Sequence, residues 1–334
     1  MIRLQELSKN FTLRDSFLGK KKIVKAVDKI SISIGKGEVL GIVGESGSGK
    51  TTLGKLVIGL LNPSSGNIYF EGQDISNQNR REKLKFRSEC RMIFQSLDAA
   101  LNPGMRVKQI IKEPLDLHNR SLTLEQKRKK IIETLNLVNL PIDYLNKYPV
   151  SLSGGEKRRL SIAKAIIYPP KLIIADEPLA ALDVSIRAQI ISLFNKLIKK
   201  LKLTMLFITH DLKIVPDLCD KVAVMYNGRI VEYGDVSLIK NKKLLHPYSR
   251  KLMSSVLTTE TVCKGKSLFM QEASVNFNHN LSRNGYACNY WQGCQLYDSS
   301  DNRMPCITKF PQLEYINDEH AIACHYKEEL ENII

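Results

Sequence analysis

GESGSGKTT, residues Gly44 to Thr52, carries the strongest structural signal in this chain of 334 residues. It matches the pattern G-x-x-x-x-G-K-[ST], in which glycines let backbone N–H groups converge on a phosphate and the next helix adds positive potential. The apolar run 38–43 before it indicates a buried strand, and residues 52–61 after it have the apolar spacing of a helix. Because this motif needs a strand on one side and a helix on the other, we expect a phosphate-binding loop rather than an ordinary glycine-rich turn.

All nine residues of this loop are candidate nucleotide ligands: Gly44, Glu45, Ser46, Gly47, Ser48, Gly49, Lys50, Thr51 and Thr52. In such loops the lysine reaches the β- and γ-phosphates, and the hydroxyl in the position of Thr51 ligates Mg²⁺. The sequence therefore predicts ATP and Mg²⁺ as cofactors.

A second apolar strand, residues 171–175, ends in the carboxylates of Asp176 and Glu177. A strand that is buried on both faces delivers Asp176 to its tip, beside the phosphate loop. We predict that Asp176 holds Mg²⁺ and that Glu177 polarises the attacking water. An acidic cap at the end of a strand is the simpler alternative for this segment alone.

The segment Leu152–Glu156 reads LSGGE and precedes an amphipathic run, residues 157–167. Ser153 is a candidate N-cap, and Gly154 and Gly155 leave N–H groups open at a helix N-terminus, which favours an anion. One γ-phosphate does not need two such sites on one chain. A dimer does, if the segment of each chain covers the nucleotide of the other; a plain helix cap is the alternative.

The order of these motifs resembles that of the nucleotide-binding subunit of an ABC transporter. The matching positions are Gly44–Thr51, Gln95, Leu152–Glu156, Asp176–Glu177, Asp183 and His210. The resemblance implies that Gln95 couples Mg²⁺ to the membrane partner, that Asp183 belongs to the D-loop, and that His210 contacts the γ-phosphate. Glu156 departs from the glutamine usual in the signature. Family members stack an aromatic ring on adenine, and Phe11 fits that register, with Phe17 as the competitor.

The resemblance implies an α/β fold: a P-loop NTPase core of the ABC ATPase type with a mostly parallel sheet, an antiparallel β subdomain and a helical subdomain. The alternation of strands and helices after residue 166 also predicts a mostly parallel sheet. We place the ATP-binding domain at residues 1–256, with the helical subdomain at about 81–165. A small cysteine-containing extension occupies residues 257–334.

Two tripeptides narrow the family. Leu101-Asn-Pro103 and His246-Pro-Tyr248 resemble those of ATP-binding subunits of oligopeptide and dipeptide importers, whose close relatives move nickel complexes. This implies an ATPase that powers peptide import, with nickel or another small solute as the alternative. It also implies two transmembrane permease subunits, a second ATP-binding subunit that is homologous rather than identical, and an extracytoplasmic solute-binding protein. The apolar runs are too short to span a membrane and no signal peptide is evident, so we expect a peripheral protein on the cytoplasmic face.

The formal net charge of +16 suggests a rival class, a soluble ABC ATPase that acts on nucleic acid or ribosomes, with an ordinary solvated surface as the alternative explanation of the charge. Members that act on ribosomes usually carry two ATPase cores, and this chain carries one. No basic motif interleaved with aromatic residues stands out, so we expect no nucleic-acid partner. A regulatory subunit with a degenerate site is disfavoured because every hydrolytic residue is present.

Seven cysteines are an odd count for a reducing compartment, which argues against a disulfide framework. The last four are Cys288, Cys294, Cys306 and Cys324, in a tail with few long apolar runs. Such a tail has too little apolar core to fold by itself, and a bound metal would cross-link and stabilise it. The spacing of the four cysteines does not distinguish a zinc site, an iron–sulfur cluster and free thiols. The resemblance to peptide importers, which often carry four cysteines and a similar His-x-x-Ala-Cys-His ending, favours [4Fe–4S]. Cys90, Cys219 and Cys263 are expected to be ordinary thiols.

Overall fold

A computed structural model describes residues 1–14, 21–76, 78–118, 121–261, 288–299 and 304–331. The chain forms two compact units, each described by itself below. Unit 1 consists of residues 1–10, 29–41 and 51–209, and unit 2 consists of residues 11–28, 42–50 and 210–334. Phe17 and Cys263, two residues named above, lie outside the described residues.

The parallel sheet of unit 1 has the strand order β4-β9-β8-β7. The strands are β4 (Val39–Val43, whose last two residues belong to unit 2), β7 (Cys90–Ile93), β8 (Leu172–Asp176) and β9 (Thr204–Thr209). Every residue of β8 and β9 is buried, which is typical of parallel strands covered on both faces. Asp176 pairs with Ile208 in the parallel ladder, so the residues that follow these two strands emerge at the same sheet edge.

Two helices of unit 1 pack on this sheet, α1 (Lys50–Val57) and α7 (Val184–Leu201). A Cβ on Gly54 would lie 2.8 Å from the side chain of Ile208, so the glycine lets α1 approach β9 closely. In α7, the ring of Phe194 packs edge-on against Phe207 of β9, with 6.1 Å between ring centroids. The sequence predicted a helix over residues 52–61. The helix instead begins at Lys50 and ends at Val57, because Gly59 adopts a left-handed φ of +71°.

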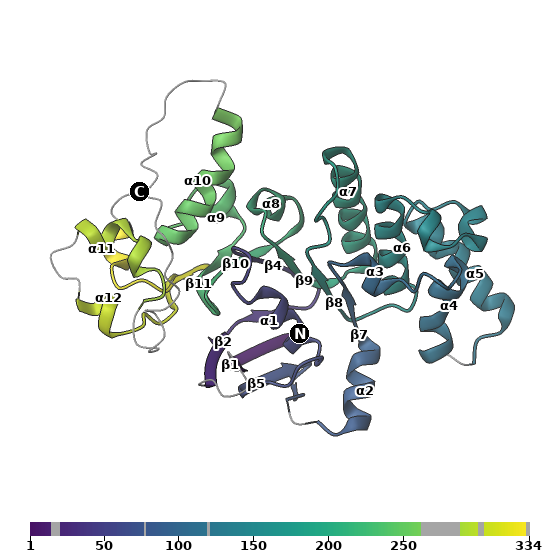
Figure 1. Ribbon diagram of the computed structural model, residues 1–334, viewed down its shortest axis with the longest axis horizontal. Coiled ribbons are helices and arrows are strands. Elements are labelled where there is room, and N and C mark those ends of the chain that lie inside the picture. The colour runs from purple at the N-terminus through teal and green to yellow at the C-terminus, as the bar shows by residue number, and fades with distance from the viewer. Residues whose placement is uncertain (15–20, 77, 119–120, 262–287, 300–303, 332–334) are drawn as a thin grey trace. The chain divides into compact units, whose positions relative to one another are not determined.

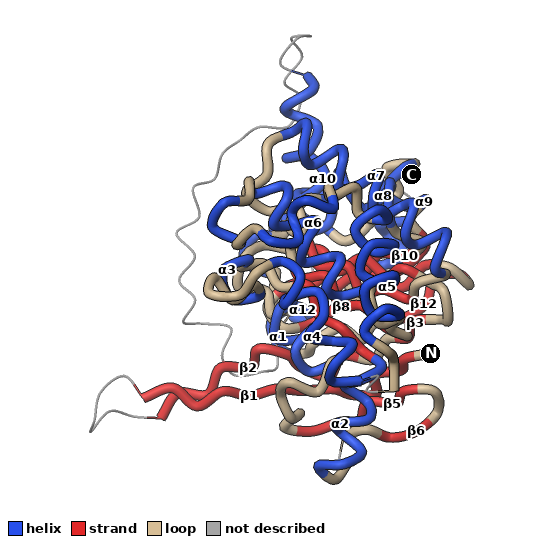
Figure 2. Tube along the Cα trace, turned by 90° about the vertical axis from the view of Figure 1, so that its right-hand side faces the viewer, coloured by secondary structure: helices blue, strands red, loops and turns tan. Residues whose placement is uncertain are grey.

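The antiparallel sheet has the order β2-β1-β5-β6, and β3 also pairs with β1. Its strands are β1 (Ile2–Arg14), β2 (Lys21–Ile30), β3 (Ser33–Ile34), β5 (Ser65–Phe70) and β6 (Gln73–Asp74). Within unit 1, helix α2 (Arg80–Glu89) lies next to β5 and β6 in Figure 2. The ring of Phe86 on this helix lies 5.0 Å from the ring of Phe70 in an edge-on arrangement.

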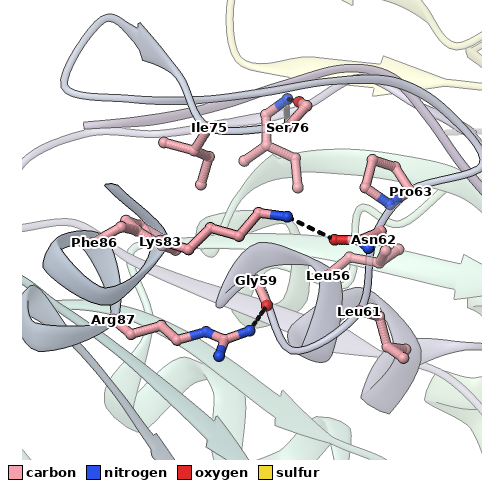
Figure 3. A pocket seen from close by; sticks show the side chains of 11 residues that line it. Leu56, Gly59, Leu61, Asn62, Pro63, Ile75, Ser76, Lys83, Phe86 and Arg87 are labelled. Carbon is pink, nitrogen blue, oxygen red and sulfur yellow. Dashed lines mark hydrogen bonds between the residues drawn. The ribbon is translucent and has the colours of Figure 1, made fainter. Parts of the chain in front are cut away.

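Polar contacts close the gap between α2 and the end of α1. Figure 3 shows Lys83 donating to the side-chain oxygen of Asn62 and Arg87 donating to the carbonyl of Gly59. The cavity among these residues measures about 10 Å³, which is space for about one water molecule. This contact therefore fastens α2 to the unit and leaves no room for a ligand.

The helices of residues 97–166 form a separate group in unit 1, and Figure 1 shows α4, α5 and α6 together. They are α3 (Leu97–Ala100), α4 (Val107–His118), α5 (Leu124–Leu137) and α6 (Gly154–Ile166), with short 3₁₀ turns at Ile142–Asn146 and Pro149–Ser151. Thr123 starts α5 with a capping box to Gln126. In the described part of the chain, no helix has the length and apolar character that a bilayer crossing requires.

Unit 2 is built on the hairpin of β10 (Lys221–Tyr226) and β11 (Arg229–Asp235), which pair antiparallel. Asn227 and Gly228 both have positive φ, +44° and +83°. This is the geometry that an Asn-Gly hairpin turn requires, and the Asn-Gly pair is a sequence signal for it. The helical elements of this region are a 3₁₀ turn at Leu212–Ile214, α8 (Val215–Leu218), α9 (Ser237–Lys240) and α10 (Pro247–Thr261).

The C-terminal segment extends this hairpin instead of forming a sheet of its own. Strand β13 (His320–Ile322) pairs antiparallel with β11, and β12 (Glu314–Asn317) pairs with β13. Short elements complete it: a 3₁₀ turn at Trp291–Gly293, α11 (Gln295–Ser299), α12 (Met304–Thr308) and α13 (Lys327–Glu331). Helix α10 runs through residue 256, where the sequence places the end of the core, and that boundary stays a prediction.

A buried carboxylate fastens this segment to the hairpin. Glu232 of β11 is 1% exposed and accepts hydrogen bonds from the backbone N–H groups of Leu245 (2.7 Å) and His246 (3.2 Å). Its Oε1 also lies 2.7 Å from Nε2 of His320 on β13. A buried carboxylate is tolerated only when it is paired and hydrogen-bonded, so these contacts fix β13 and the approach to α10 together.

Replacing Glu232 by alanine removes the partner of His320 and of two buried N–H groups. We expect a loss of about 3 kcal/mol in the free energy of unfolding and faster proteolysis within residues 288–331. Glu314→Ala is the matched control, because Glu314 pairs with Lys327 at an exposed site of the same segment and such pairs contribute less than about 1 kcal/mol. Equal denaturant midpoints and cleavage rates for the two variants would contradict the assignment.

Candidate functional site

The first seven residues of the phosphate loop, Gly44–Lys50, belong to unit 2. The ammonium group of Lys50 is buried and donates to the carbonyl oxygens of Gly44 (2.7 Å) and Glu45 (2.8 Å). Residues 45–47 are exposed, whereas Ser48 is buried. The lysine thus sits inside the curve of the loop, where its charge is available to a phosphate.

Close backbone packing explains a glycine of the motif. Gly49 has φ of +105°, and a Cβ there would lie 2.1 Å from the carbonyl oxygen of Ala26. Both the left-handed conformation and the lack of space require glycine. Two further bonds reach the loop from elsewhere in unit 2: Tyr248 Oη accepts from Glu45 N–H (2.9 Å), and Gly228 N–H donates to the Ser48 carbonyl (2.9 Å).

Thr51 and Asp176, the predicted Mg²⁺ ligands of unit 1, are in direct contact. Thr51 Oγ1 donates to Asp176 Oδ1 over 3.0 Å. Asp176 ends β8 and is 3% exposed. Hydroxyl and carboxylate oxygens are the hard donors that Mg²⁺ prefers, so this pair fits the ion.

Glu177 and Gln95 form the second pair in unit 1. Gln95 Nε2 donates to Glu177 Oε2 over 3.0 Å, and Glu177 N–H donates to the carbonyl of Ile208. Glu177 adopts φ of +44°, a left-handed conformation that is uncommon for a residue other than glycine and concentrates at active sites. The carboxylate expected to polarise water is therefore held by the residue expected to sense the membrane partner.

Arg158 is a positioning residue that motif reasoning missed. It is 2% exposed, and its guanidinium donates to the backbone carbonyls of Phe94 (2.9 Å) and Gln95 (3.2 Å). Burial lowers the pKa of Arg158 to about 10, which leaves it charged at neutral pH. The run Lys157-Arg158-Arg159 resembles a solvated face. However, Gly155, Arg158 and Ser161 are spaced three residues apart and therefore lie on one face of α6, and all three are buried. This spacing is the sequence signal that could have identified Arg158 as buried.

The signature segment forms the start of α6, as predicted from Ser153. Ser153 Oγ accepts from Glu156 N–H (3.3 Å), and the Glu156 carboxylate accepts from Ser153 N–H (2.8 Å) and from Tyr144 Oη–H (2.8 Å). The bond from the Ser153 backbone and that from Tyr144 lower the pKa of Glu156. Glu156, the departure from the family pattern, therefore completes a capping box. A Cβ on Gly155 would lie 2.8 Å from the side chain of Ile186, whereas Gly154 faces open space.

The remaining predicted residues lie at element ends or edges. Asp183 is the N-cap of α7 and accepts from Ile186 N–H (2.9 Å), so it is bonded to its own helix and not to the Thr51–Asp176 or Gln95–Glu177 pair. His210 directly follows β9 and is exposed. Phe11 lies in β1 and is 36% exposed, and Thr52 is half-buried in α1.

The four tail cysteines lie in one another's electrostatic field. Burial raises the pKa of Cys288 to about 12, with smaller contributions from Cys306, Cys324 and Cys294 and an opposing hydrogen bond to the Tyr290 backbone. Burial likewise raises that of Cys324 to about 12, with further contributions from Cys294 and Cys306. Cys288 N–H also donates to the Cys306 carbonyl over 2.8 Å. Among the described residues, no three Cys, His, Asp or Glu side chains lie close enough together to hold one metal ion. Cys90 and Cys219 are buried.

Comparison with known proteins identifies the family of this chain. Residues 27–180 match the protein-family model for ABC transporters. The chain is 40% identical to the oligopeptide transport ATP-binding protein AppF of Bacillus subtilis, over 97% of both chains. It is 42% identical to the dipeptide transport ATP-binding protein DppF of Lactococcus lactis subsp. cremoris, over 73% of this chain and 78% of that one.

Among solved structures, the dimeric post-hydrolysis state of the ATP-binding cassette MJ0796 bound to ADP and Pi matches 71% of this chain and 99% of its own. The TM-score is 0.64 and the identity 26%. Fold and site together define an ABC-type ATPase, which confirms the predicted α/β class. The chain belongs to the family of oligopeptide and dipeptide transport ATP-binding proteins.

Arg158→Met tests the anchoring of Gln95. The variant leaves the carbonyls of Phe94 and Gln95 without their charged donor. We expect a loss of about 1.5–3 kcal/mol in the free energy of unfolding, as for hydrogen bonds to a charged group, and a severalfold fall in ATP hydrolysis because Gln95 is released. Arg159→Met is the control: Arg159 is the next residue of α6 but donates to Val138 and Gln189, away from Gln95. If the two variants hydrolyse ATP at the same rate, Arg158 does not position Gln95.

Proposed function

We propose that this chain is the ATP-hydrolysing subunit that powers peptide import through a membrane transporter. The hydrogen bond between Gln95 and Glu177 carries the proposal, because it joins the candidate catalytic carboxylate to the segment expected to face the membrane subunits. The 40% identity to AppF, an oligopeptide transport ATP-binding protein, extends over 97% of this chain and supports a peptide as the cargo over nickel.

Each pair of residues has a distinct task in hydrolysis. Lys50 and the N–H groups of the phosphate loop bind the β- and γ-phosphates. Thr51 and Asp176 would hold Mg²⁺, which neutralises charge on the phosphates when it is bound. Glu177 accepts a proton from the water that attacks the γ-phosphorus, the bond to the bridging oxygen breaks, and ADP and phosphate leave. His210 contacts the γ-phosphate and Phe11 stacks on adenine.

A cavity in the helical group of unit 1 suits the permease partner. It measures about 200 Å³ and is lined by Leu97, Leu101, Pro103, Pro149, Val150 and Lys157, all in unit 1. Val150 is 79% exposed, and exposed apolar side chains around a hollow favour a protein contact. We propose that one of two transmembrane permease subunits docks here, at the cytoplasmic face of the membrane.

The signature segment suits a second ATP-binding subunit. Ser153 and Gly154 are exposed at the N-terminus of α6, a helix of 13 residues, where N–H groups and the helix dipole favour a phosphate. We propose that Ser153, Gly154, Gly155 and Glu156 cover the nucleotide of a homologous partner chain, and that Asp183 lies at the same interface. An extracytoplasmic solute-binding protein would deliver the peptide.

Glu177→Gln keeps the shape of the side chain and removes its basicity. We expect ATP hydrolysis to fall by at least about 100-fold, while ATP binding persists and the ATP-bound dimer accumulates. Steady-state phosphate release and size-exclusion chromatography with Mg-ATP measure the two effects. Glu113→Gln is the control, because Glu113 pairs with Lys164 on the surface of the helical group. Unchanged hydrolysis in Glu177→Gln would exclude Glu177 as the general base.

We also propose that Cys288, Cys294, Cys306 and Cys324 hold a [4Fe–4S] cluster. Each of these thiols belongs to one neighbourhood, and four thiolates are the ligand set that such clusters take. A cluster is larger than a single ion, so it takes thiolates that lie farther apart than those around zinc. It would cross-link a segment whose own apolar cluster is small, formed by Leu245, Ile322 and Leu330.

Metal content tests this second proposal. Anaerobically purified protein is expected to be brown and to contain about four irons per chain. Cys306→Ser should lose the colour and the iron, whereas Cys219→Ala, at a buried thiol outside the four, should keep both. Colourless protein with one zinc per chain, or with no metal, would replace the cluster by a zinc site or by free thiols.

A further inference from the structure

The cysteine segment comprises the described residues 288–299 and 304–331, which carry the four tail cysteines. Its residue Tyr290 packs against two other tyrosines of unit 2. It is 4% exposed and lies two residues after Cys288. Its ring packs edge-on against Tyr226 of β10, with centroids 5.4 Å apart, and against Tyr248 of α10, with centroids 5.5 Å apart. Tyr226 and Tyr248 are 4.4 Å apart. Three mutually packed rings form a rigid contact.

Tyr248 also contacts the phosphate loop directly. The side chain is fully buried, and its hydroxyl oxygen accepts the hydrogen bond from Glu45 N–H at 2.9 Å. On its other side, Tyr248 N–H donates to Nδ1 of His246, whose pKa burial lowers to about 3, so that the ring is neutral and can accept. Tyr248 is therefore held by hydrogen bonds at both its backbone N–H and its side-chain hydroxyl.

Asn289, the residue before Tyr290, connects to the phosphate loop through a second set of hydrogen bonds. Asn289 Nδ2 donates to the carbonyl of Asn227, in the turn between β10 and β11, over 3.2 Å. The next residue of that turn, Gly228, donates its N–H to the Ser48 carbonyl over 2.9 Å. Asn289 and Tyr290 are thus connected to the loop at two points, Glu45 and Ser48, which lie on either side of Gly47.

Two hydrogen bonds, from Glu45 N–H to Tyr248 and from Gly228 N–H to the Ser48 carbonyl, fix the curvature of the loop. Gly47 has φ of +81°, and a glycine in this conformation is free to move unless its neighbours are held. With Glu45 N–H occupied by Tyr248, the phosphate is left to the N–H groups farther along the loop. Donors that are held in place before the ligand arrives bind it more tightly, because less entropy is lost on binding.

We propose that Tyr248 is a positioning residue for the phosphate loop and that Asn289 and Tyr290 brace it, so that an ordered cysteine segment raises the affinity for nucleotide phosphates. The inference rests on the proposed assignment of Gly44–Thr52 as the ATP site. Thermodynamic linkage makes the effect reciprocal. Nucleotide bound at the loop stabilises the cysteine segment by the same factor.

The full chain and a fluorescent ATP analogue with Mg²⁺ test the brace. Tyr248→Phe keeps the ring and removes the acceptor, and we expect its dissociation constant to rise about threefold to tenfold, as the loss of one hydrogen bond implies. Competition by tripolyphosphate, which lacks adenosine, should weaken by the same factor. Binding is compared at a temperature at which circular dichroism shows both chains to be folded, where a merely structural role would leave the dissociation constant unchanged.

The part played by the tail is tested separately. Tyr290→Ala should weaken binding by a similar factor, whereas Tyr290→Phe, which retains the ring, and Tyr297→Phe, in the same segment against Trp291, should bind as the wild type does. Wild-type affinity in Tyr248→Phe overturns the positioning role, and wild-type affinity in Tyr290→Ala overturns the brace.

Lys50→Ala distinguishes a failure of the positioning role of Tyr248 from a failure of the proposed ATP site. If Lys50→Ala abolishes binding while Tyr248→Phe does not weaken it, the ATP site stands and the inference fails. If the wild-type chain does not bind Mg-ATP, the proposed function and the inference fail together.

Discussion

A phosphate-binding loop must keep several backbone N–H groups pointing at one spot that no protein acceptor fills. Folded chains ordinarily pair such groups, and parallel dipoles that converge repel one another. In this protein the loop is stabilised from within by the Lys50 ammonium on the carbonyls of Gly44 and Glu45. It is stabilised from outside by Tyr248 and Gly228. The remaining structure serves to place these supports and the carboxylates that complete the chemistry.

The carboxylates illustrate how a parallel sheet concentrates function. Asp176 ends a fully buried strand, and Glu177 follows it in a left-handed conformation. That conformation costs about 1–3 kcal/mol, and the hydrogen bonds of Glu177 N–H to Ile208 and of its carboxylate to Gln95 offset the cost. Arg158 in turn holds the backbone of Gln95. The left-handed conformation of Glu177, the proposed general base, is thus supported through Gln95 by a buried guanidinium.

The cysteine segment is more than a terminal appendage in this arrangement. It extends the β10–β11 hairpin by two strands and is tied to it by the buried Glu232–His320 pair. From there, Asn289 and Tyr290 reach the partners of the phosphate loop. Residues of the tail therefore contact the partners of the phosphate loop.

The sequence by itself determined the motifs whose parts are contiguous: the phosphate loop, the capping box of Ser153, the strand ending in Asp176 and Glu177, and the Asn227–Gly228 turn. Local backbone chemistry specifies each of these, because glycine conformations, caps and apolar runs act over a few residues. The exception among local features was the end of α1, where Gly59 outweighed the apolar spacing. The tertiary structure alone decided contacts between residues far apart in the chain: Arg158 with Phe94, 64 residues away, Glu232 with His320, 88 away, and Glu45 with Tyr248, 203 away. Such partners carry no periodic or spacing signal, since chain folding, and not sequence neighbourhood, brings a buried donor to its acceptor.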